Sequence, residues 1–233
     1  MKYMSIKNAT DTSADLYFYG DIVGSEWDKW ENEDTCPQDV INFLDQVKDV
    51  KSLNIYVNSG GGSVFAGIAI YNILKRHKAF KTVYVDGLAA SISSVIALAG
   101  DKVVMPSNAF LMIHKPWAWT SGNATDFRKM ADDLDRIEQG IINVYADNLR
   151  EGVDIETIKE MVNAETWLVG SEAEKYFNIE VAEPTQAAAA LGDSVRYYQN
   201  MPKALKKPAA PEENKADETE LLNMSLELEL LTA

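Results

Sequence analysis

The chain has 233 residues, of which 46% are hydrophobic and 25% are charged, and its formal net charge is −14. These values are typical of a globular protein, and the length suits one α/β domain of about 150–200 residues with an appendage. The acidic balance argues against nonspecific binding to nucleic acid or to an anionic membrane, because both require clustered Lys and Arg. No stretch approaches the roughly 20 continuous apolar residues of a membrane span, and the first residues lack the apolar core of a signal peptide. We therefore expect a cytoplasmic protein.

Cysteine and histidine are scarce. Cys36 is the only cysteine, and His77 and His114 are the only histidines. An intrachain disulfide, a cysteine-based zinc site and a histidine-rich metal site are therefore excluded, and we expect no metal or cofactor. His77 lies in a basic run at the end of an amphipathic helix, where it is expected on the surface. Any imidazole chemistry then falls to His114.

Short apolar runs rich in β-branched residues alternate with longer amphipathic segments along the chain. Strands are predicted at 15–19, 53–57, 82–85, 102–105 and 110–113. Helices are predicted at 37–47, 63–76, 89–99, 124–150, 154–162 and 171–177, with an extended segment at 163–169. This alternation indicates right-handed βαβ crossovers around a mainly parallel, buried sheet, and therefore an α/β fold.

Composition divides the chain into three parts. Residues 1–14 are polar and are expected to be flexible, whereas 15–184 hold all the predicted strands and helices. Residues 185–233 begin with an alanine run and a Pro/Lys/Ala/Glu-rich stretch, which is typical of a linker or a disordered tail. That tail ends in an apolar segment, 220–231, which we expect to bind a partner. Within the domain, 124–150 is longer than an average globular helix and either projects to meet a neighbour or packs across its own domain.

Ser91 lies where a predicted buried strand, broken by Asp86-Gly87, gives way to a helix of small residues. Its hydroxyl is expected where the chain leaves the sheet, and the unpaired N–H groups of the first helical turn point toward any developing negative charge. A serine nucleophile and its oxyanion hole need this arrangement. Alternatively, Ser91, Ser93 and Ser94 are helix caps and small packing residues, and this segment alone does not decide between the two interpretations.

Other candidate groups lie at the ends of other predicted strands. The run Gly60-Gly-Gly62 allows bare backbone N–H groups to approach a ligand, although it lacks the spacing of a phosphate-binding or dinucleotide-binding loop. His114 directly follows a predicted strand. In a parallel sheet, both groups and Ser91 lie at the carboxyl ends of neighbouring strands, where α/β proteins bind ligands. A base histidine needs an acid to orient it, and Glu165 is the candidate, although spacing alone does not choose one acid.

Four motifs resemble those of the proteolytic subunit of the Clp protease, especially the shorter Clp-like serine peptidases of phages and prophages. Asn58-Ser-Gly-Gly-Gly-Ser-Val64 is similar to the family's Asn-Ser-Pro-Gly-Gly-Ser-Val loop, and Gly87-Leu-Ala-Ala-Ser-Ile92 to its Gly-Gln-Ala-Ala-Ser-Met turn. Phe110-Leu-Met-Ile-His-Lys-Pro116 is similar to its Met-Ile-His-Gln-Pro segment. Glu165-Thr-Trp-Leu-Val-Gly-Ser-Glu-Ala173 occupies the place of its Asp-x-Phe-Met-Ser…Glu-Ala motif. The motifs follow the family's order, and the resemblance covers about 15–184.

The resemblance assigns catalytic roles. It implies a Ser–His–acid triad in which Ser91 is the nucleophile, His114 the general base and Glu165 the acid. The implied reaction is endopeptidase hydrolysis of unfolded or extended polypeptides through an acyl-enzyme. Two departures stand out, because the family has Asp where this chain has Glu165 and Pro where it has Gly60.

Backbone groups complete the implied site. The resemblance places oxyanion-hole N–H groups at Gly61 and Ile92, and backbone pairing with the substrate strand at Gly60 and Gly62. Ile92 replaces a methionine of the family, a change without consequence where only the N–H is used.

The resemblance also implies a fold and an assembly. The fold is a crotonase-like α/β spiral of βαβ units, with helix 124–150 as a protruding handle. The handle implies a homo-oligomer of heptameric rings, as one ring or as a stacked pair that encloses a chamber. An ATP-dependent unfoldase, or phage capsid and scaffold proteins during head maturation, are candidate partners.

Two other functions share parts of this pattern. A crotonase-type acyl-CoA hydratase or isomerase has the same fold and oxyanion geometry, but it needs no Ser–His pair. A catalytically inactive structural subunit of a ring or phage shell needs neither Ser91 nor His114. A Ser–Lys peptidase is disfavoured by the position of His114. Labelling by a fluorophosphonate distinguishes the serine peptidase from the acyl-CoA enzyme and from the inactive subunit.

Overall fold

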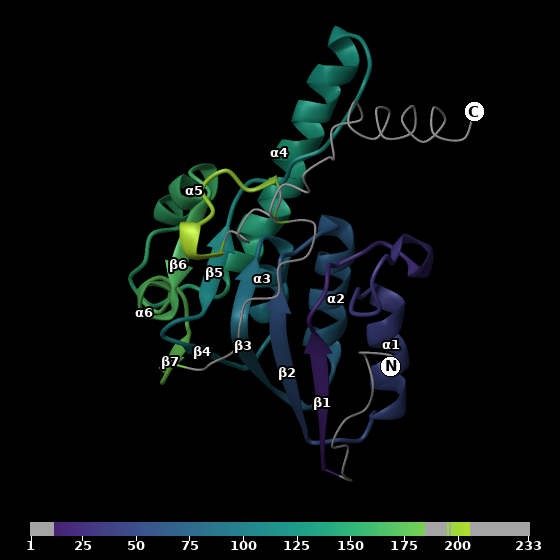
Figure 1. Ribbon diagram of the computed structural model, residues 1–233, viewed down its shortest axis with the longest axis vertical. Coiled ribbons are helices and arrows are strands. Elements are labelled where there is room, and N and C mark those ends of the chain that lie inside the picture. Colours follow the sequence, from purple (N-terminus) through teal and green to yellow (C-terminus); the bar gives the residue numbers. More distant parts are fainter. Residues whose placement is uncertain (1–11, 185–194, 196, 206–233) are drawn as a thin grey trace, which may run out of the picture. The chain divides into compact units, whose positions relative to one another are not determined.

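A seven-stranded sheet runs through the part of the chain that the structure describes, and β5–β6 is its one antiparallel pair (Figure 1). The computed structural model describes residues 12–184, 195 and 197–205. The strands are β1 (Ser13–Phe18), β2 (Ser52–Ser59), β3 (Phe80–Ala90), β4 (Lys102–Pro106), β5 (Phe110–Ile113), β6 (Thr166–Val169) and β7 (Glu180–Ala182). Their order is β1-β2-β3-β4-β7, with β5 beside β3 and β6 beside β5. The α/β fold class predicted from the sequence is confirmed.

β3 is longer than predicted because it changes neighbours along its length. Its first half pairs with β4 at Thr82–Tyr84, and its second half pairs with β5 at Leu88–Ala90. The predicted break at Asp86-Gly87 is therefore wrong, and so is the predicted helix start at residue 89. Pairing with β5 keeps these small residues extended until Ser91, and the helix α3 (Ile92–Ala97) starts only after it.

The two faces of β1–β3 differ in burial. Leu16, Ile55 and Val83 lie in register on one face and are fully buried, in one hydrophobic cluster with residues of the helices. The opposite face carries a ladder of half-buried tyrosines, in which the ring centroids of Tyr17 and Tyr56 are 4.6 Å apart and those of Tyr56 and Tyr84 are 5.2 Å apart. At β1–β3 the sheet is therefore fully buried on one face and only half-buried on the other, whereas the sequence predicted burial of the whole sheet.

Three of the other helices in the described part of the chain follow a residue whose side chain accepts a bond from a free backbone N–H group. Ser63 precedes α2 and accepts a bond from the N–H of Ala66, and Asp154 precedes α5 and accepts one from Glu156. The predicted helix at 171–177 is too long, because α6 spans a single turn before the chain turns toward β7. The helices are η1 (Glu26–Asp28), α1 (Pro37–Gln46), α2 (Val64–Arg76), α4 (Ala124–Ala146), α5 (Ile155–Asn163), α6 (Gly170–Ala173) and η3 (Lys203–Leu205).

α4 is anchored at its C-terminal end only. Asn123 caps its start, and Ile141 and Tyr145 near its end are buried in the core. Its first turns are exposed, including Phe127, and Figure 1 shows them standing clear of the sheet. The helix ends at Ala146 rather than at residue 150 as predicted. An amphipathic helix that leaves its first turns exposed fits the predicted projection better than packing across its own domain.

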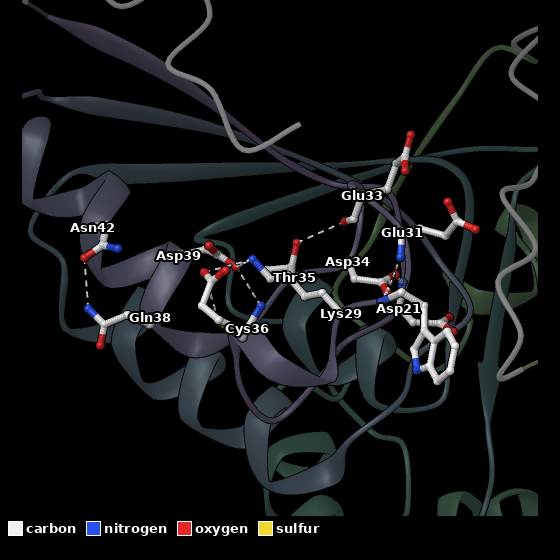
Figure 2. A network of polar contacts seen from close by, with 12 residues as sticks. Asp21, Lys29, Glu31, Glu33, Asp34, Thr35, Cys36, Gln38, Asp39 and Asn42 are labelled. Carbon is white, nitrogen blue, oxygen red and sulfur yellow. Dashed lines mark hydrogen bonds and ion pairs between the residues drawn. The ribbon is translucent and has the colours of Figure 1, made fainter. Parts of the chain in front are cut away.

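The loop between β1 and α1 is held by the buried carboxylate of Asp34 (Figure 2). Its two oxygens accept bonds from the backbone N–H groups of Asp21, at 3.0 Å, and of Trp30, at 2.9 Å. The same loop bonds to the glycine run, since the N–H of Ile22 donates to the carbonyl of Gly61 at 2.7 Å. The loop is thereby fixed beside the carboxyl ends of the strands.

The boundaries of the predicted domain need revision at both ends. β1 begins at Ser13, inside the segment 1–14 that was expected to be flexible. Of the predicted tail, Val195 and Tyr197–Met201 belong to the same compact unit as the sheet, and we call them the return segment. Pro202–Leu205, the last described residues, belong to a second unit. The apolar segment 220–231 lies outside the described residues.

Candidate active site

Ser91 occupies the sharp turn between β3 and α3. Its backbone has φ 56° and ψ −129°, a conformation that non-glycine residues rarely adopt. Its N–H donates to the carbonyl of Met112 in β5 at 2.9 Å, which fixes the turn against the neighbouring strand. Strained turns of this kind expose a side chain at the end of a strand, and they gather at functional sites. The Ser91 hydroxyl makes no helix-capping bond, so it remains available for other partners.

His114 follows the last residue of β5, and its Nε2 lies 2.7 Å from Ser91 Oγ. Burial of the imidazole lowers the pKa of His114 below its usual 6.5, and the negative charge of Glu165 opposes this effect. A neutral imidazole accepts the proton of a serine hydroxyl, whereas a charged one does not. The structure thus brings together the predicted nucleophile and the predicted base in the geometry that proton transfer requires.

Glu165 lies near this pair, but its hydrogen bonds go elsewhere. Its carboxylate accepts bonds from the backbone N–H of Asn200 at 2.6 Å, from that of Gln199 at 2.9 Å and from Trp167 Nε1 at 3.3 Å. Within the described residues, no hydrogen bond joins it to His114. Its backbone has φ 49°, so the turn before β6 is strained as well. In this structure the interaction of Glu165 with His114 is therefore electrostatic, without a direct bond.

The backbone N–H groups of the glycine run differ in their availability. The N–H of Gly61 donates to Ser59 Oγ at 3.2 Å, so it is already occupied. The N–H groups of Gly62 and Ile92 make no hydrogen bond with any residue that the structure describes, and each of these residues lines a cavity together with Ser91. A Cβ at Gly62 would lie 2.1 Å from the carbonyl oxygen of Ile22, so only glycine fits there. Gly60, the fourth predicted binding residue, uses its carbonyl to accept a bond from the Tyr198 hydroxyl.

Ser91 and His114 open into a cavity of about 880 Å³. Apolar and aromatic side chains form most of its walls, and α4 contributes Met130, Leu134 and Ile137. The charged residues around it are Asp21, Asp28, Asp133 and Arg136. Its volume is at the upper end for small-ligand sites, which range over roughly 300–1,000 Å³. The cavity has room for several consecutive side chains of a peptide.

Ser93, Ser94 and His77 pack and form hydrogen bonds away from the Ser91–His114 pair. The hydroxyl of Ser93 lies 2.7 Å from the carbonyl of Ala90, and that of Ser94 lies 2.8 Å from the Tyr145 hydroxyl. Both serines are fully buried packing residues, as one of the two sequence interpretations held. His77 caps α2 and accepts a bond from the N–H of Ala79 at 3.2 Å. It is half-buried rather than on the surface, and burial lowers its pKa.

A group of potential metal ligands in the β1–α1 loop is already neutralised. Glu26, Cys36 and Asp39 lie close together, but Lys29 Nζ is 2.6 Å from Asp39 and 3.0 Å from Glu26. Figure 2 shows Lys29, Cys36 and Asp39 at the start of α1. The lysine supplies the positive charge there, so this group is an ion-pair cluster.

The comparison with known proteins gives one consistent result. A profile of the family described as Clp protease matches residues 12–180. The chain belongs to the Clp protease family. Its fold class and its reaction class follow from this membership, because the family's proteolytic subunits are serine-type peptidases. The predicted hydrolase class is confirmed.

The chain matches about two thirds of the length of its named relatives in the Clp protease family. The ATP-dependent Clp protease proteolytic subunit of Ligilactobacillus salivarius is 35% identical over 137 residues, which are 58% of this chain and 68% of that protein. The proteins of the same name from Bacteroides fragilis and Borreliella afzelii are 30% and 32% identical and are covered over 65% and 68% of their lengths. Among the described residues, no helix is long and apolar enough to cross a membrane.

Sequence reasoning missed two features of this site. The bonds from Gln199 and Asn200 to Glu165, and the contact of Tyr198 with His114, come from the segment that its composition marked as tail. The only signal was the pair Tyr197-Tyr198, which is unusual in an otherwise Ala/Pro/Lys-rich stretch.

Proposed function

We propose that this protein is a serine endopeptidase in which Ser91 is the nucleophile and His114 the general base. The 2.7 Å contact between Ser91 Oγ and His114 Nε2 carries this proposal. The hydroxyl donates its proton to Nε2 as Oγ attacks the carbonyl carbon of the scissile peptide bond. His114 then returns that proton to the leaving amine, and an acyl-enzyme on Ser91 remains. In the second step His114 accepts a proton from water as the water attacks the ester, and it returns that proton to Ser91 Oγ as the ester bond breaks.

The oxyanion of the tetrahedral intermediate is assigned to the free backbone donors. Ile92 provides the N–H that directly follows the nucleophile, as the sequence predicted. The bond of the Gly61 N–H to Ser59 Oγ favours Gly62 over Gly61 as the second donor. Two fixed N–H groups aimed at the developing charge stabilise the transition state, and the loss of one such donor typically slows a reaction about 100- to 1,000-fold.

Glu165 serves as the acid by electrostatic stabilisation. When His114 takes the serine proton it becomes an imidazolium, and a nearby carboxylate stabilises that charge. The fixed orientation of Glu165, set by its bonds to Gln199, Asn200 and Trp167, keeps this charge in place. The presence of Glu165 in place of the family's Asp is compatible with this role, because electrostatic stabilisation of the His114 imidazolium does not require a direct bond between the two side chains.

The proposed substrate is an unfolded or extended polypeptide, which a large open cavity accepts more readily than a folded chain. The proposed pairing partners of the substrate strand are backbone groups of Gly60 and Gly62 other than the Gly62 N–H, which is assigned to the oxyanion, and the Gly60 carbonyl, which Tyr198 binds. The proposed assembly is a heptameric ring, single or paired, with α4 as the contact between rings. Its relatives are named as subunits of an ATP-dependent protease. The proposed partners are therefore an ATP-dependent unfoldase or, for a phage enzyme, capsid and scaffold proteins.

Covalent labelling by a fluorophosphonate tests the proposed nucleophile and base. We expect the purified protein to be labelled on Ser91, which peptide mass spectrometry identifies. Labelling is lost in Ser91→Ala and falls at least about 100-fold in His114→Ala, because the base is removed. Ser121→Ala and His77→Gln, which alter an exposed serine and the other histidine, are the matched controls and keep the rate of the unaltered protein.

The result also separates the proposal from its alternatives. A protein that is not labelled at Ser91, although it is folded by circular dichroism, is a structural subunit or a non-serine enzyme and contradicts the proposal. Family membership and the Ser91–His114 contact both disfavour the crotonase-type acyl-CoA enzyme.

A further inference from the structure

The return segment, Val195 and Tyr197–Met201, comes back to the active site after the last strand of the sheet. We propose that Tyr198 is a positioning residue for His114 and for the glycine run, and that Gln199 and Asn200 hold Glu165 in place. The proposal rests on the proposed function, because it takes Ser91 and His114 as the reacting pair.

Tyr198 contacts the base and the glycine run at the same time. Its ring centroid lies 5.1 Å from that of His114, with the two rings nearly perpendicular at 79°. Its hydroxyl donates to the carbonyl of Gly60. The side chain is only 8% exposed and packs in a small cluster with Leu88 and Met112, which lie in the two strands that lead to Ser91 and His114. One buried side chain thus joins two of the loops from which the site is built.

The next two residues fix the acid. The backbone N–H groups of Gln199 and Asn200 each donate to one oxygen of the Glu165 carboxylate. The side chain of Asn200 also donates to the carbonyl of Ala164 at 2.9 Å, which ties down the strained turn at Glu165. Bonds to both oxygens leave the carboxylate one orientation, so its charge has a fixed position relative to His114.

The return segment is a wall of the site and does not plug it. Tyr197 and Tyr198 line the same cavity as Ser91 and His114, and the contact between Ser91 and His114 is intact. Tyr197 extends this wall outward by packing against Trp117, with ring centroids 4.6 Å apart and the ring planes inclined at 49°. A segment that blocked the site would occupy the space in front of Ser91, which the cavity leaves open. The contacts therefore indicate a supporting role.

This arrangement has a consequence for His114 that can be measured. Burial lowers the pKa of His114, and the Tyr198 ring packs against the imidazole and covers part of it. Glu165 is the charged group whose field reaches the ring, and Tyr198 is the titratable group packed on it. The other charged groups of the cavity are Asp21, Asp28, Asp133 and Arg136. Without the tyrosine ring, water reaches His114 and its pKa rises toward 6.5.

The test is the rate of fluorophosphonate labelling of the full chain as a function of pH. In Tyr198→Ala we expect the rate at pH 7 to fall about tenfold and the midpoint of the acid limb to move up by about half a pH unit. Tyr198→Phe keeps the ring on His114 and loses only the hydroxyl bond. We expect its acid limb to stay in place and its rate to stay within about threefold of the unaltered protein.

A second pair of variants tests the hold on Glu165. Gln199→Pro removes the N–H that donates to the Glu165 carboxylate, whereas Gln199→Ala keeps this N–H. Both variants replace a side chain that is exposed in the unaltered protein. We expect labelling to slow about fivefold in Gln199→Pro and to be unchanged in Gln199→Ala. If circular dichroism shows that Tyr198→Ala is not folded, the labelling rates of Gln199→Pro and Gln199→Ala test the role of the return segment instead.

The outcomes are distinguishable. Faster labelling in Tyr198→Ala shows an inhibitory cover and overturns the proposal. The proposal is also overturned if a folded Tyr198→Ala is labelled more slowly but the midpoint of its acid limb has not moved, because such a result is an effect of packing alone. Equal rates in Gln199→Pro and Gln199→Ala overturn the part that concerns Glu165. If the unaltered protein is not labelled at all, the proposed function itself fails.

Discussion

Ser91 and His114 are held at 2.7 Å by the register of two adjacent parallel strands. Ala90, the last residue of β3, pairs with Met112 of β5, so the chain leaves the two strands at almost the same level. The nucleophile directly follows Ala90, and the base directly follows Ile113, the last residue of β5. Because main-chain bonds fix this register, the distance between the two reacting atoms does not depend on a flexible loop.

The pH dependence of labelling reports the environment of His114. Burial lowers the pKa of this imidazole, and the charge of Glu165 raises it. We therefore expect the labelling rate to rise with pH through a midpoint below 6.5, as the reactive neutral form accumulates. In Glu165→Gln the opposing charge is gone, so the midpoint moves to still lower pH by about half a unit. The rate at pH 7 falls about tenfold, because the imidazolium formed during attack is less stabilised.

The control for that experiment is Glu160→Gln, which removes an exposed carboxylate from α5. It should leave both the midpoint and the rate unchanged. A midpoint that rises in Glu165→Gln, or does not move, contradicts the electrostatic role of Glu165.

Gly62 tolerates no side chain. Its φ is 139°, and a Cβ would lie 2.1 Å from the carbonyl oxygen of Ile22. We expect Gly62→Ala to lower the free energy of unfolding by about 3 kcal/mol and to abolish labelling, because the loop that provides the oxyanion donor must move. Gly152→Ala is the matched control, since Gly152 has φ 85° but nothing within 4 Å of a Cβ. Its cost is about 1 kcal/mol from backbone strain alone, and labelling stays normal. Urea unfolding gives both energies, and equal values would disprove the clash.

The ion pair of Lys81 and Asp101 stabilises the start of β3. Lys81 is almost fully buried, and its Nζ lies 2.9 Å from Asp101. Burial raises the pKa of Asp101, but its hydrogen bonds with Lys81 outweigh this and lower it. A carboxylate whose pKa is lowered on folding stabilises the protein above its unfolded pKa, near 4, and loses this effect as the pH falls.

We expect Asp101→Asn to lower the free energy of unfolding by about 2 kcal/mol at pH 7 and by much less at pH 3. Urea unfolding at the two pH values measures the difference. Asp45→Asn breaks the exposed pair with Lys48 and should change stability by less than about 0.5 kcal/mol. A loss in Asp101→Asn that is the same at both pH values would refute this account.

The exposed first turns of α4 predict self-association. Phe127 is 51% exposed, and it lies on the part of the helix that stands clear of the sheet (Figure 1). We expect light scattering to give the mass of a ring-sized particle at micromolar concentration. Phe127→Ser should shift that mass toward smaller species, because it removes apolar surface from the contact, while Ala131→Ser on the same helix should not. A monomeric mass for the unaltered protein contradicts the proposed assembly.

The sequence was most informative where chemistry and topology coincide. Ser91, His114 and the glycine run each follow an apolar strand, and a parallel sheet brings such positions to one edge. It was least informative where a distant neighbour decides the local structure. Ala89 and Ala90 favour a helix by themselves, and only the pairing with β5 makes them part of a strand. The contacts of Tyr198 depend on where the chain returns after Pro184, which composition does not encode.

The register that fixes Ser91 and His114 also divides the protein into a part that resists change and a part that accepts it. Two strands in the middle of the sheet set the nucleophile and the base, so substitutions there risk the fold and the reaction together. Much of the cavity wall comes from the β1–α1 loop, α4 and the return segment, none of which belongs to those strands. Engineering of this peptidase toward other peptide sequences should therefore begin with the loops and the return segment, where specificity can be altered while the reacting pair is left intact.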